Sequence, residues 1–414
     1  MNTVEETLTS KKAIKLEEKY GAHNYHPLPV VLDRGEGVYV WDVEGKKYFD
    51  FLSAYSAINQ GHCHPRIINA LKQQAERITL TSRAFYNSRL GEFEKYMSEY
   101  FGFDKILPMN SGAEAVETAI KISRKWGYEK KGVNENEAQI VVCANNFHGR
   151  TTTIISFSND EDARKNFGPY TAGFIKVEYN DTNALEEALK SNKNIVSFLV
   201  EPIQGEAGVF VPNDGYLTAA RELCSKHNVL FIADEIQTGI ARTGDLLAVD
   251  HEGVKPDMLI LGKALSGGVY PVSAVLANDD IMNVIKPGQH GSTFGGNPLA
   301  AAVAMEALEV VKDENLAENA KRLGELFRVK MNEYISGSKL VKLVRGRGLL
   351  NAIVINDSED SSTAWDICVK LKDNGLLAKP THGNIIRFAP PLVMNEEQLL
   401  ECVSIITTTL KGFE

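Results

Sequence analysis

The strongest constraint on the fold is a series of short apolar runs that alternate with amphipathic segments from about residue 61 to residue 300. A strand that is buried on both faces is apolar throughout, and such strands separated by helices form mostly parallel α/β sheets. One intervening helix is predicted at residues 216–227. The predicted strands lie at residues 139–143, 154–157, 196–200, 229–233 and 258–261.

The pattern changes on both sides of this region. The first 60 residues combine a charged helical start with Pro-containing turns, and residues 38–48 predict a β-hairpin. A long helix is predicted at residues 299–311, and mixed strands and helices follow it. A chain of 414 residues is long enough for more than one structural unit. We therefore predict an N-terminal segment (1–60), a large α/β domain (61–300) and a small C-terminal α+β domain (301–414).

Composition excludes several classes of protein. The net charge of −9 argues against nucleic-acid binding, which depends on neutralising phosphates. The five cysteines are odd in number and form no Cys-x-x-Cys pair, so we expect a reducing compartment. No apolar run approaches the roughly 20 residues of a membrane span. The first residues, Met1 to Glu6, show no secretory or transit pattern, and we expect a cytoplasmic protein unless a presequence has been removed.

Two polar residues follow neighbouring predicted strands. Asp234 comes directly after residues 229–233, and Lys263 follows residues 258–261 and one glycine. Ligands of open parallel sheets lie beyond the carboxyl ends of the strands, so both side chains are expected in one crevice. A lysine can form a Schiff base with a pyridoxal aldehyde, and a carboxylate can pair with its ring nitrogen. Alternatively, Lys263 is a surface residue and Asp234 caps a turn.

Two further segments could bind a phosphate. Ser111 and Glu114 fit a capping box at the start of a helix, and Gly112 allows a ligand to approach the backbone. A helix N-terminus offers free amide donors and a positive partial charge. Ser292 and Thr293 stand among glycines in a second segment. An ordinary capped helix and a flexible loop are the alternatives.

Other chemistries have weaker support. Ala264 follows Lys263, so the phosphate loop of nucleotide hydrolases is absent, and no dinucleotide-binding glycine motif follows a strand. His62 and His64 flank Cys63, but no other ligand cluster accompanies them, which favours a structural role over a metal site. Cys143 ends a predicted strand, and we expect a buried, inert thiol there.

Several motifs, taken in order, resemble the pyridoxal-phosphate aminotransferases of fold type I that act on ω-amino groups. These motifs are NSGAEA (110–115), FHGRT (147–151), VEPIQGEAG (200–208), FIADEIQTG (231–239) and LGKALSGG (261–268). The resemblance narrows to the ornithine aminotransferases and covers the chain from about residue 23 to its end. The segments that narrow it are AHNYHPLPV (22–30), YSAINQGHCHP (55–65) and LLAKPTHGNIIRFAPPL (376–392).

The resemblance implies pyridoxal 5′-phosphate as the cofactor and assigns residues to it. Lys263 matches the Schiff-base lysine, Asp234 the partner of the pyridine nitrogen, and Gln237 a neighbour of the phenolic oxygen. Phe147 matches the residue that stacks on the ring. The phosphate is then held by Ser111, Gly112 and Ala113 of one subunit, with Ser292 and Thr293 of a second. A homodimer with shared active sites is implied.

The resemblance also assigns the substrate site. Arg150 matches the residue that holds the ornithine carboxylate, and Tyr25 and Tyr55 match residues that orient ornithine for reaction at its δ-amine. Glu206 and Arg387 match a switchable ion pair. Arginine suits such roles because it binds a carboxylate through two parallel hydrogen bonds.

The implied reaction moves the δ-amino group of L-ornithine to 2-oxoglutarate by ping-pong kinetics. Its products are glutamate and glutamate γ-semialdehyde, which cyclises to pyrroline-5-carboxylate, and this implies a place in arginine and proline metabolism. His148 stands where many ornithine enzymes have tryptophan, and acetylornithine-type relatives share this form. Acetylornithine and 4-aminobutyrate therefore stay open as substrates, and a non-catalytic binding protein is an alternative of another class.

Overall fold

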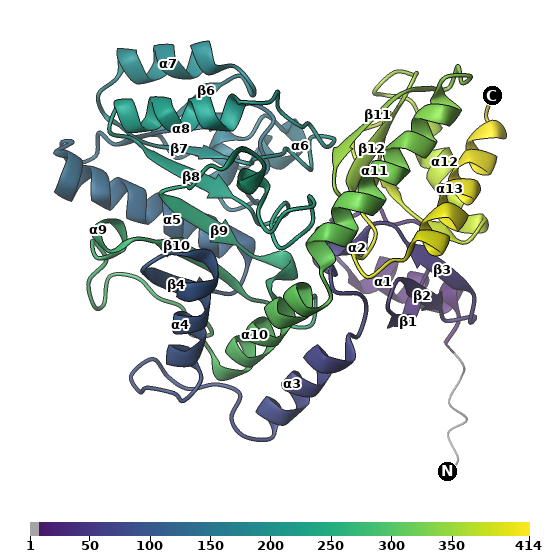
Figure 1. Ribbon diagram of the computed structural model, residues 1–414, viewed down its shortest axis with the longest axis horizontal. Coiled ribbons are helices and arrows are strands. Elements are labelled where there is room, and N and C mark those ends of the chain that lie inside the picture. Colours follow the sequence, from purple (N-terminus) through teal and green to yellow (C-terminus); the bar gives the residue numbers. More distant parts are fainter. Residues whose placement is uncertain (1–7) are drawn as a thin grey trace.

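A seven-stranded sheet forms the centre of the larger of two lobes (Figure 1). Its strand order is β4-β10-β9-β8-β7-β5-β6, and β10 runs antiparallel to β4 and β9. The other neighbouring pairs are parallel, which confirms the predicted mostly parallel sheet. The strands are β4 (Lys105–Met109), β5 (Gln139–Cys143), β6 (Phe174–Val177), β7 (Ile195–Val200), β8 (Leu230–Asp234), β9 (Met258–Leu261) and β10 (Ser273–Ala277).

Four of the five predicted strands are confirmed within a residue or so as β5, β7, β8 and β9. The prediction for residues 154–157 was wrong, because Ile154–Phe157 forms a 3-10 helix. Its apolar side chains are buried without strand pairing, and β6 occupies the adjacent edge of the sheet instead. A four-residue apolar run indicates burial but not backbone conformation, and this is why the pattern misled.

Helices cover both faces of the sheet, and alternate strand residues face them. On β8, Ile232 belongs to a buried cluster with α5 (Gly112–Trp126), whereas Phe231 and Ala233 belong to a second cluster with α8 (Tyr216–Lys226). The predicted helix at residues 216–227 is thus confirmed. The other helices of this lobe are α3 (Pro65–Ala75), α4 (Leu90–Phe101), α6 (Glu161–Arg164), α7 (Thr182–Ser191), α9 (Asp279–Met282) and α10 (Pro298–Asp313).

The smaller lobe contains two four-stranded sheets. One has the order β11-β12-β15-β14, and in the other the N-terminal strands β1, β2 and β3 are joined by β13 from the C-terminal part. β2 and β3 form the predicted hairpin. The strands are β1 (Leu32–Glu36), β2 (Tyr39–Asp42), β3 (Lys47–Asp50), β11 (Val341–Arg347), β12 (Leu350–Ile355), β13 (Leu376–Leu377), β14 (Lys379–Pro380) and β15 (Ile385–Phe388). The helices are α1 (Ser10–Tyr20), α2 (Ser53–Ser56), α11 (Leu316–Ile335), α12 (Thr363–Asp373) and α13 (Glu396–Lys411).

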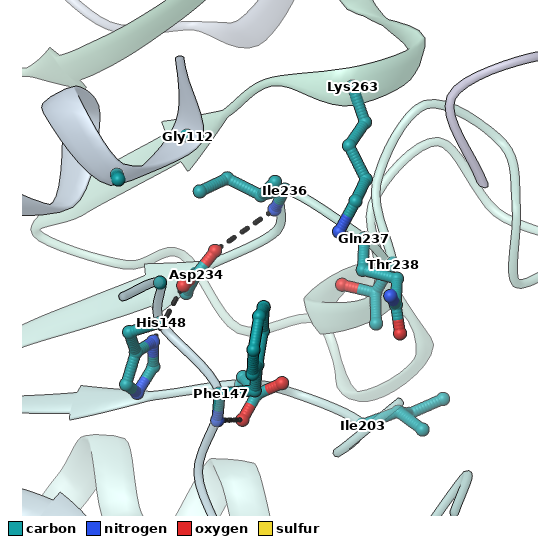
Figure 2. A pocket seen from close by; sticks show the side chains of 12 residues that line it. Gly112, Phe147, His148, Ile203, Asp234, Ile236, Gln237, Thr238 and Lys263 are labelled. Atoms are coloured by element: carbon teal, nitrogen blue, oxygen red, sulfur yellow. Dashed lines mark hydrogen bonds and ion pairs between the residues drawn. The ribbon is translucent and has the colours of Figure 1, made fainter. Parts of the chain in front are cut away.

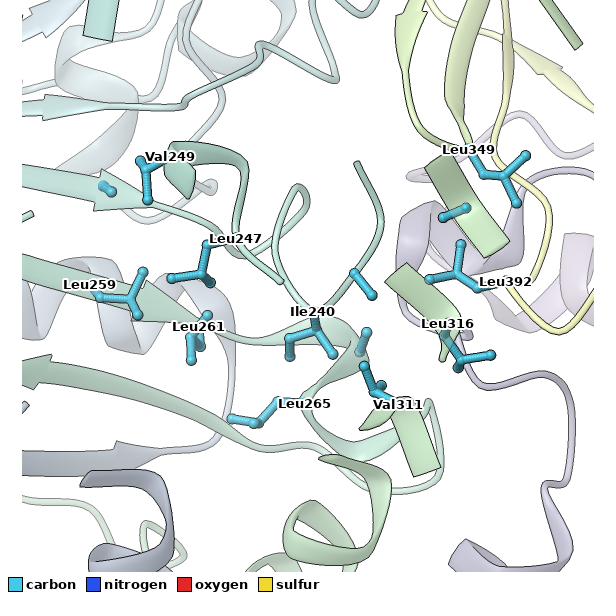
Figure 3. Packing of buried hydrophobic residues seen from close by; sticks show 14 of the residues in the cluster. Ile240, Leu247, Val249, Leu259, Leu261, Leu265, Val311, Leu316, Leu349 and Leu392 are labelled. Carbon is cyan, nitrogen blue, oxygen red and sulfur yellow. The ribbon is translucent and has the colours of Figure 1, made fainter. Parts of the chain in front are cut away.

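The two lobes share one hydrophobic core. Figure 3 shows Leu261 and Ile240 of the large lobe on one side of this core and Leu349 and Leu392 of the small lobe on the other. Because β13 pairs with β3, the first and last parts of the chain also depend on each other. The division at residues 60 and 300 stays a prediction.

The structure describes residues 8–414. The first six residues, on which the targeting prediction rested, lie outside this range. Within it, none of the helices combines the length and the apolar character needed to cross a membrane.

Candidate active site

The carboxyl ends of β8 and β9 open into a cavity of about 200 Å³ in the large lobe. Figure 2 shows Lys263 extending into it from above and Asp234 lying deeper, beside the turn that carries Ile236. The structure therefore brings together the two residues that the strand ends predicted. Phe147 and Gln237 also line this cavity.

Lys263 is held in an unusual environment. Its backbone has a φ of 44°, a left-handed conformation that is uncommon for a residue other than glycine. Such strain is found where the surroundings fix a functional side chain. Burial and the nearby charge of Arg387 lower the pKa of the Lys263 amine. Both effects favour the neutral amine that nucleophilic attack and proton transfer require.

Asp234 has a partner that sequence reasoning missed. Nδ1 of His148 donates a hydrogen bond to Asp234 Oδ2 at 2.6 Å, and both side chains are buried. Burial disfavours the charged imidazole, but the hydrogen bond and charge of Asp234 raise the pKa of His148 overall. The backbone N–H of Ile236 donates to the other carboxylate oxygen at 3.1 Å. His148 was noted only as a departure from a motif, and a titratable residue directly after Phe147 was the available signal.

The predicted capping box is present at the start of α5. The Glu114 N–H donates to Ser111 Oγ at 3.2 Å, and the Ser111 N–H donates to the Glu114 carboxylate at 2.7 Å. Gly112 lines the cavity, and a Cβ atom there would lie 3.0 Å from the Ile236 side chain. Ala113 lines it as well. The helix N-terminus thus faces the cavity, as phosphate binding requires.

The second predicted phosphate segment lies nearby but not in the cavity. Asn110 Nδ2 donates a hydrogen bond to Ser292 Oγ of the same chain at 2.8 Å. Thr293 is exposed, and neither residue lines the cavity. Within one subunit, the structure does not bring Ser292 and Thr293 to the other predicted cofactor residues.

The cavity fits pyridoxal phosphate. Gln237 Oε1 is buried and has no hydrogen-bond partner in the protein, so a polar ligand group can satisfy it. Gly205 leaves room for this side chain, because a Cβ there would lie 1.5 Å from that oxygen and displace it. Phe147 is held in place because its N–H donates to Glu201 at 2.9 Å. Lys263 is therefore available to the aldehyde of the cofactor, and Asp234 to its pyridine nitrogen. The Gln237 amide is available to its phenolic oxygen, and the Phe147 ring to its ring.

Glu206 and Arg387 form an ion pair with 2.9 Å between Oε2 and Nη1. Burial raises the pKa of Glu206, but Arg387 outweighs this and holds that pKa below its usual range. The guanidinium lies 5.0 Å from the centre of the Tyr55 ring. Tyr55 belongs to the turn Ser53–Ser56, in which all four residues have positive φ. Burial and Glu206 raise the pKa of Tyr55.

The other two residues predicted to bind substrate, Arg150 and Tyr25, are less enclosed. The Arg150 side chain is 62% exposed, and its Nη2 lies 3.7 Å from Asp160 Oδ2. Its guanidinium also lies 5.9 Å from the centre of the Phe147 ring. Tyr25 is 71% exposed, although it is close enough to act electrostatically on Tyr55. The sequence did not single out Asp160 as a partner of Arg150.

The structure also bears on the predictions for His62, His64 and Cys143. His62 pairs with Asp50 at 2.8 Å and His64 with Glu314 at 2.9 Å. Among residues 8–414, no group of three or more His, Cys, Asp or Glu side chains is arranged to hold a metal. Cys143 is buried, and burial raises the pKa of its thiol to about 12, consistent with an inert role.

Comparisons with known proteins agree with this geometry. The family model for class-III aminotransferases matches residues 20–410. A Drosophila melanogaster protein named ornithine aminotransferase, mitochondrial, is 63% identical over 95% of this chain and 90% of its own. Among solved structures, an ornithine aminotransferase from Toxoplasma gondii, described with pyridoxal phosphate at partial occupancy, has a TM-score of 0.96 and 51% identity. That alignment covers 98% of this chain and 95% of the other.

Another solved structure is described as acetylornithine aminotransferase from Elizabethkingia anophelis. It has a TM-score of 0.91 and 65% identity, and the alignment covers 98% of this chain and all of the other. The two descriptions agree on the reaction type and differ in the substrate.

The expectation of a cytoplasmic protein is contradicted by these comparisons, because the Drosophila melanogaster relative is named mitochondrial. The sequence argument rested on a missing targeting pattern. Presequences are removed after import, so such an absence does not determine the compartment.

Proposed function

Because the chain belongs to the class-III aminotransferases, and within them to the ornithine aminotransferases, we propose that it transfers the δ-amino group of L-ornithine to 2-oxoglutarate. The enzyme is a pyridoxal-phosphate-dependent transaminase of fold type I. The observation that carries the substrate proposal is the ion pair between Glu206 and buried Arg387 beside Lys263.

The cofactor supplies an aldehyde for the amino group and a ring that withdraws electrons from the reacting carbon. The protein then has two tasks at this carbon. The neutral amine of Lys263, favoured by its lowered pKa, would accept the proton that leaves the δ-carbon of ornithine. Asp234, held by His148 and the Ile236 N–H, would pair with the pyridine nitrogen of the bound cofactor.

Ornithine carries two amines, and the proposed site selects between them. Arg387 is the arginine whose charge acts on Lys263, so it could hold an α-carboxylate there, but Glu206 already pairs with it. Arg150, at the exposed side of Phe147, then holds the ornithine carboxylate away from the reacting carbon. With Tyr25 and Tyr55 beside the α-amine, the δ-amine reaches the reaction centre.

The second half-reaction requires the opposite state of this ion pair. The carboxylate of 2-oxoglutarate next to its keto carbon needs an anchor close to Lys263. Arg387 provides this anchor once Glu206 has moved away. Glutamate γ-semialdehyde leaves before 2-oxoglutarate binds, so the kinetics are ping-pong.

We also propose a homodimer with shared active sites. Two observations support it: Thr293 is exposed outside the cavity of its own subunit, and Tyr25 is 71% exposed. A second copy would cover these residues, and its Ser292 and Thr293 would complete the phosphate site.

Acetylornithine is the second candidate substrate, and the 65% identical structure from Elizabethkingia anophelis favours it. The two substrates are distinguished by incubating the enzyme and 2-oxoglutarate with ornithine, acetylornithine or 4-aminobutyrate and measuring glutamate release. Pyrroline-5-carboxylate formed from ornithine at the highest kcat/KM supports the proposal. A higher kcat/KM for acetylornithine would replace it. The Lys263→Ala variant serves as the inactive control.

A further inference from the structure

A second cavity of about 400 Å³ adjoins the active site on the outer side of Glu206. The residues that matter here are Phe147, Asp160, Glu206, Phe210, Glu359 and His382. The Glu206 side chain is 33% exposed, whereas its partner Arg387 is only 2% exposed. Glu206 therefore has room to move outward into this cavity, and Arg387 does not.

His382 lies at the tip of the hairpin between β14 and β15. The Thr381 N–H donates to the Ile385 carbonyl at 2.9 Å, which closes the hairpin, and His382 adopts a φ of 63°. Thr381 Oγ1 donates to the carbonyl of Glu206 itself at 2.5 Å. The tip that carries His382 is thus tied to the backbone of the residue that must move.

A carboxylate that loses its ion-pair partner in a partly buried site is destabilised unless another cation replaces it. Besides Arg387, the basic side chains that act on Glu206 are Lys263 and His382. Lys263 is committed to the reacting carbon. His382 is the remaining basic side chain, and it shares the outer cavity with Glu206. Glu359 and Asp160, which are acidic like Glu206, line the same cavity. Asp160 is paired with Arg150.

We propose that His382 is a positioning residue that receives the Glu206 carboxylate when a 2-oxo acid takes Arg387. This inference rests on the proposed function, because it requires Glu206 to leave Arg387 in one half-reaction only. His382 would stabilise the open state of the ion pair without touching either substrate. It would therefore lower the KM of the 2-oxo acid and leave the ornithine half-reaction unaffected.

The variant to test is His382→Asn, because asparagine tolerates the left-handed backbone at this position. We expect the KM for 2-oxoglutarate to rise about two- to fivefold, the range of an exposed ion pair, while kcat is unchanged. The Kd of glutarate, which lacks a reacting keto group, should rise by the same factor in calorimetry on the holoenzyme. The ornithine half-reaction, followed by single-turnover absorbance, should stay as in wild type. His382→Lys, which keeps a basic side chain at this position, should recover part of the loss.

A double-mutant cycle with Glu206→Gln gives the decisive comparison. If His382 acts through the Glu206 carboxylate, His382→Asn has no further effect on glutarate binding in the Glu206→Gln background. An equal loss of glutarate affinity in both backgrounds, or an equal loss of rate in both half-reactions, would overturn the proposal. His227→Asn, at the end of α8 outside both cavities, is the matched control. If the wild-type enzyme did not use ornithine, the substrate proposal would fail. The proposal for His382 would still stand if His382→Asn weakened glutarate binding only when Glu206 was intact.

Discussion

Arg387 and Glu206 form an ion pair in which the arginine is buried and the glutamate reaches an open cavity. Arg387 Nη1 donates both to Glu206 Oε2 at 2.9 Å and to the Gly205 carbonyl at 3.2 Å. The arginine is thus held by the backbone as well as by the carboxylate. We therefore expect Glu206 to be the partner that moves, and this asymmetry underlies the proposed choice between the two half-reactions.

Removing the Glu206 carboxylate should expose Arg387 to any α-amino acid. We expect Glu206→Ala to improve the glutamate half-reaction relative to the ornithine half-reaction, because nothing then competes for Arg387. Single-turnover absorbance with each amino acid added separately measures both rates. Glu187→Ala, an exposed position on α7, is the control. An unchanged ratio in Glu206→Ala would refute the masking role.

Arg150 should matter for ornithine and not for glutamate. Loss of a charge-assisted contact to a carboxylate costs about 1.5–3 kcal/mol, which is about ten- to a hundredfold in kcat/KM. Arg150→Ala should therefore weaken the ornithine half-reaction by this factor. Asp160→Asn is the complementary variant, and it should weaken neither half-reaction because it only frees Arg150. Equal losses in both half-reactions for Arg150→Ala would show that Arg150 is not the distal anchor.

Lys263 should be the lysine that bonds to the cofactor. Borohydride reduction of the holoenzyme followed by peptide mapping should place the label on Lys263. The informative comparison is Lys131, because burial lowers the pKa of its amine to about 8, although its Nζ donates to the Ile195 and His227 carbonyls. Label on Lys131 would contradict the assignment. Lys263→Ala should still bind the cofactor non-covalently but lose turnover.

Glu201 should make stability depend on pH. Burial raises the pKa of this carboxyl to about 8, so the folded state keeps its proton while the unfolded state loses it above about pH 4.5. The folded state then binds more protons, and stability falls as pH rises between these two values. Relative to Glu201→Gln, wild type should lose up to about 1.4 kcal/mol per pH unit in this window. Urea denaturation of both proteins from pH 5 to 8 tests this. If the free energy of unfolding depended on pH equally in both proteins, Glu201 would not carry a proton in the folded state.

Local patterns in the sequence predicted most of the central sheet. Continuous apolar runs identified β5, β7, β8 and β9, since burial on both faces leaves a signature within each strand. Asp234 and Lys263 followed from this, because residues just beyond parallel strands meet at one edge. The capping box at Ser111 was equally readable, since its hydrogen bonds span three residues. Each of these features depends on neighbours close in the chain.

Tertiary structure decided the relationships between distant segments. His148 and Asp234 meet because β5 and β8 end at the same edge of the sheet, and no local pattern records that pairing. Glu206 meets Arg387 only because the small lobe packs against the large one. Residues 154–157 form a 3-10 helix, and β6 pairs with β5 at the edge of the sheet. A chain encodes burial locally, but contacts between distant side chains arise only when the lobes pack together.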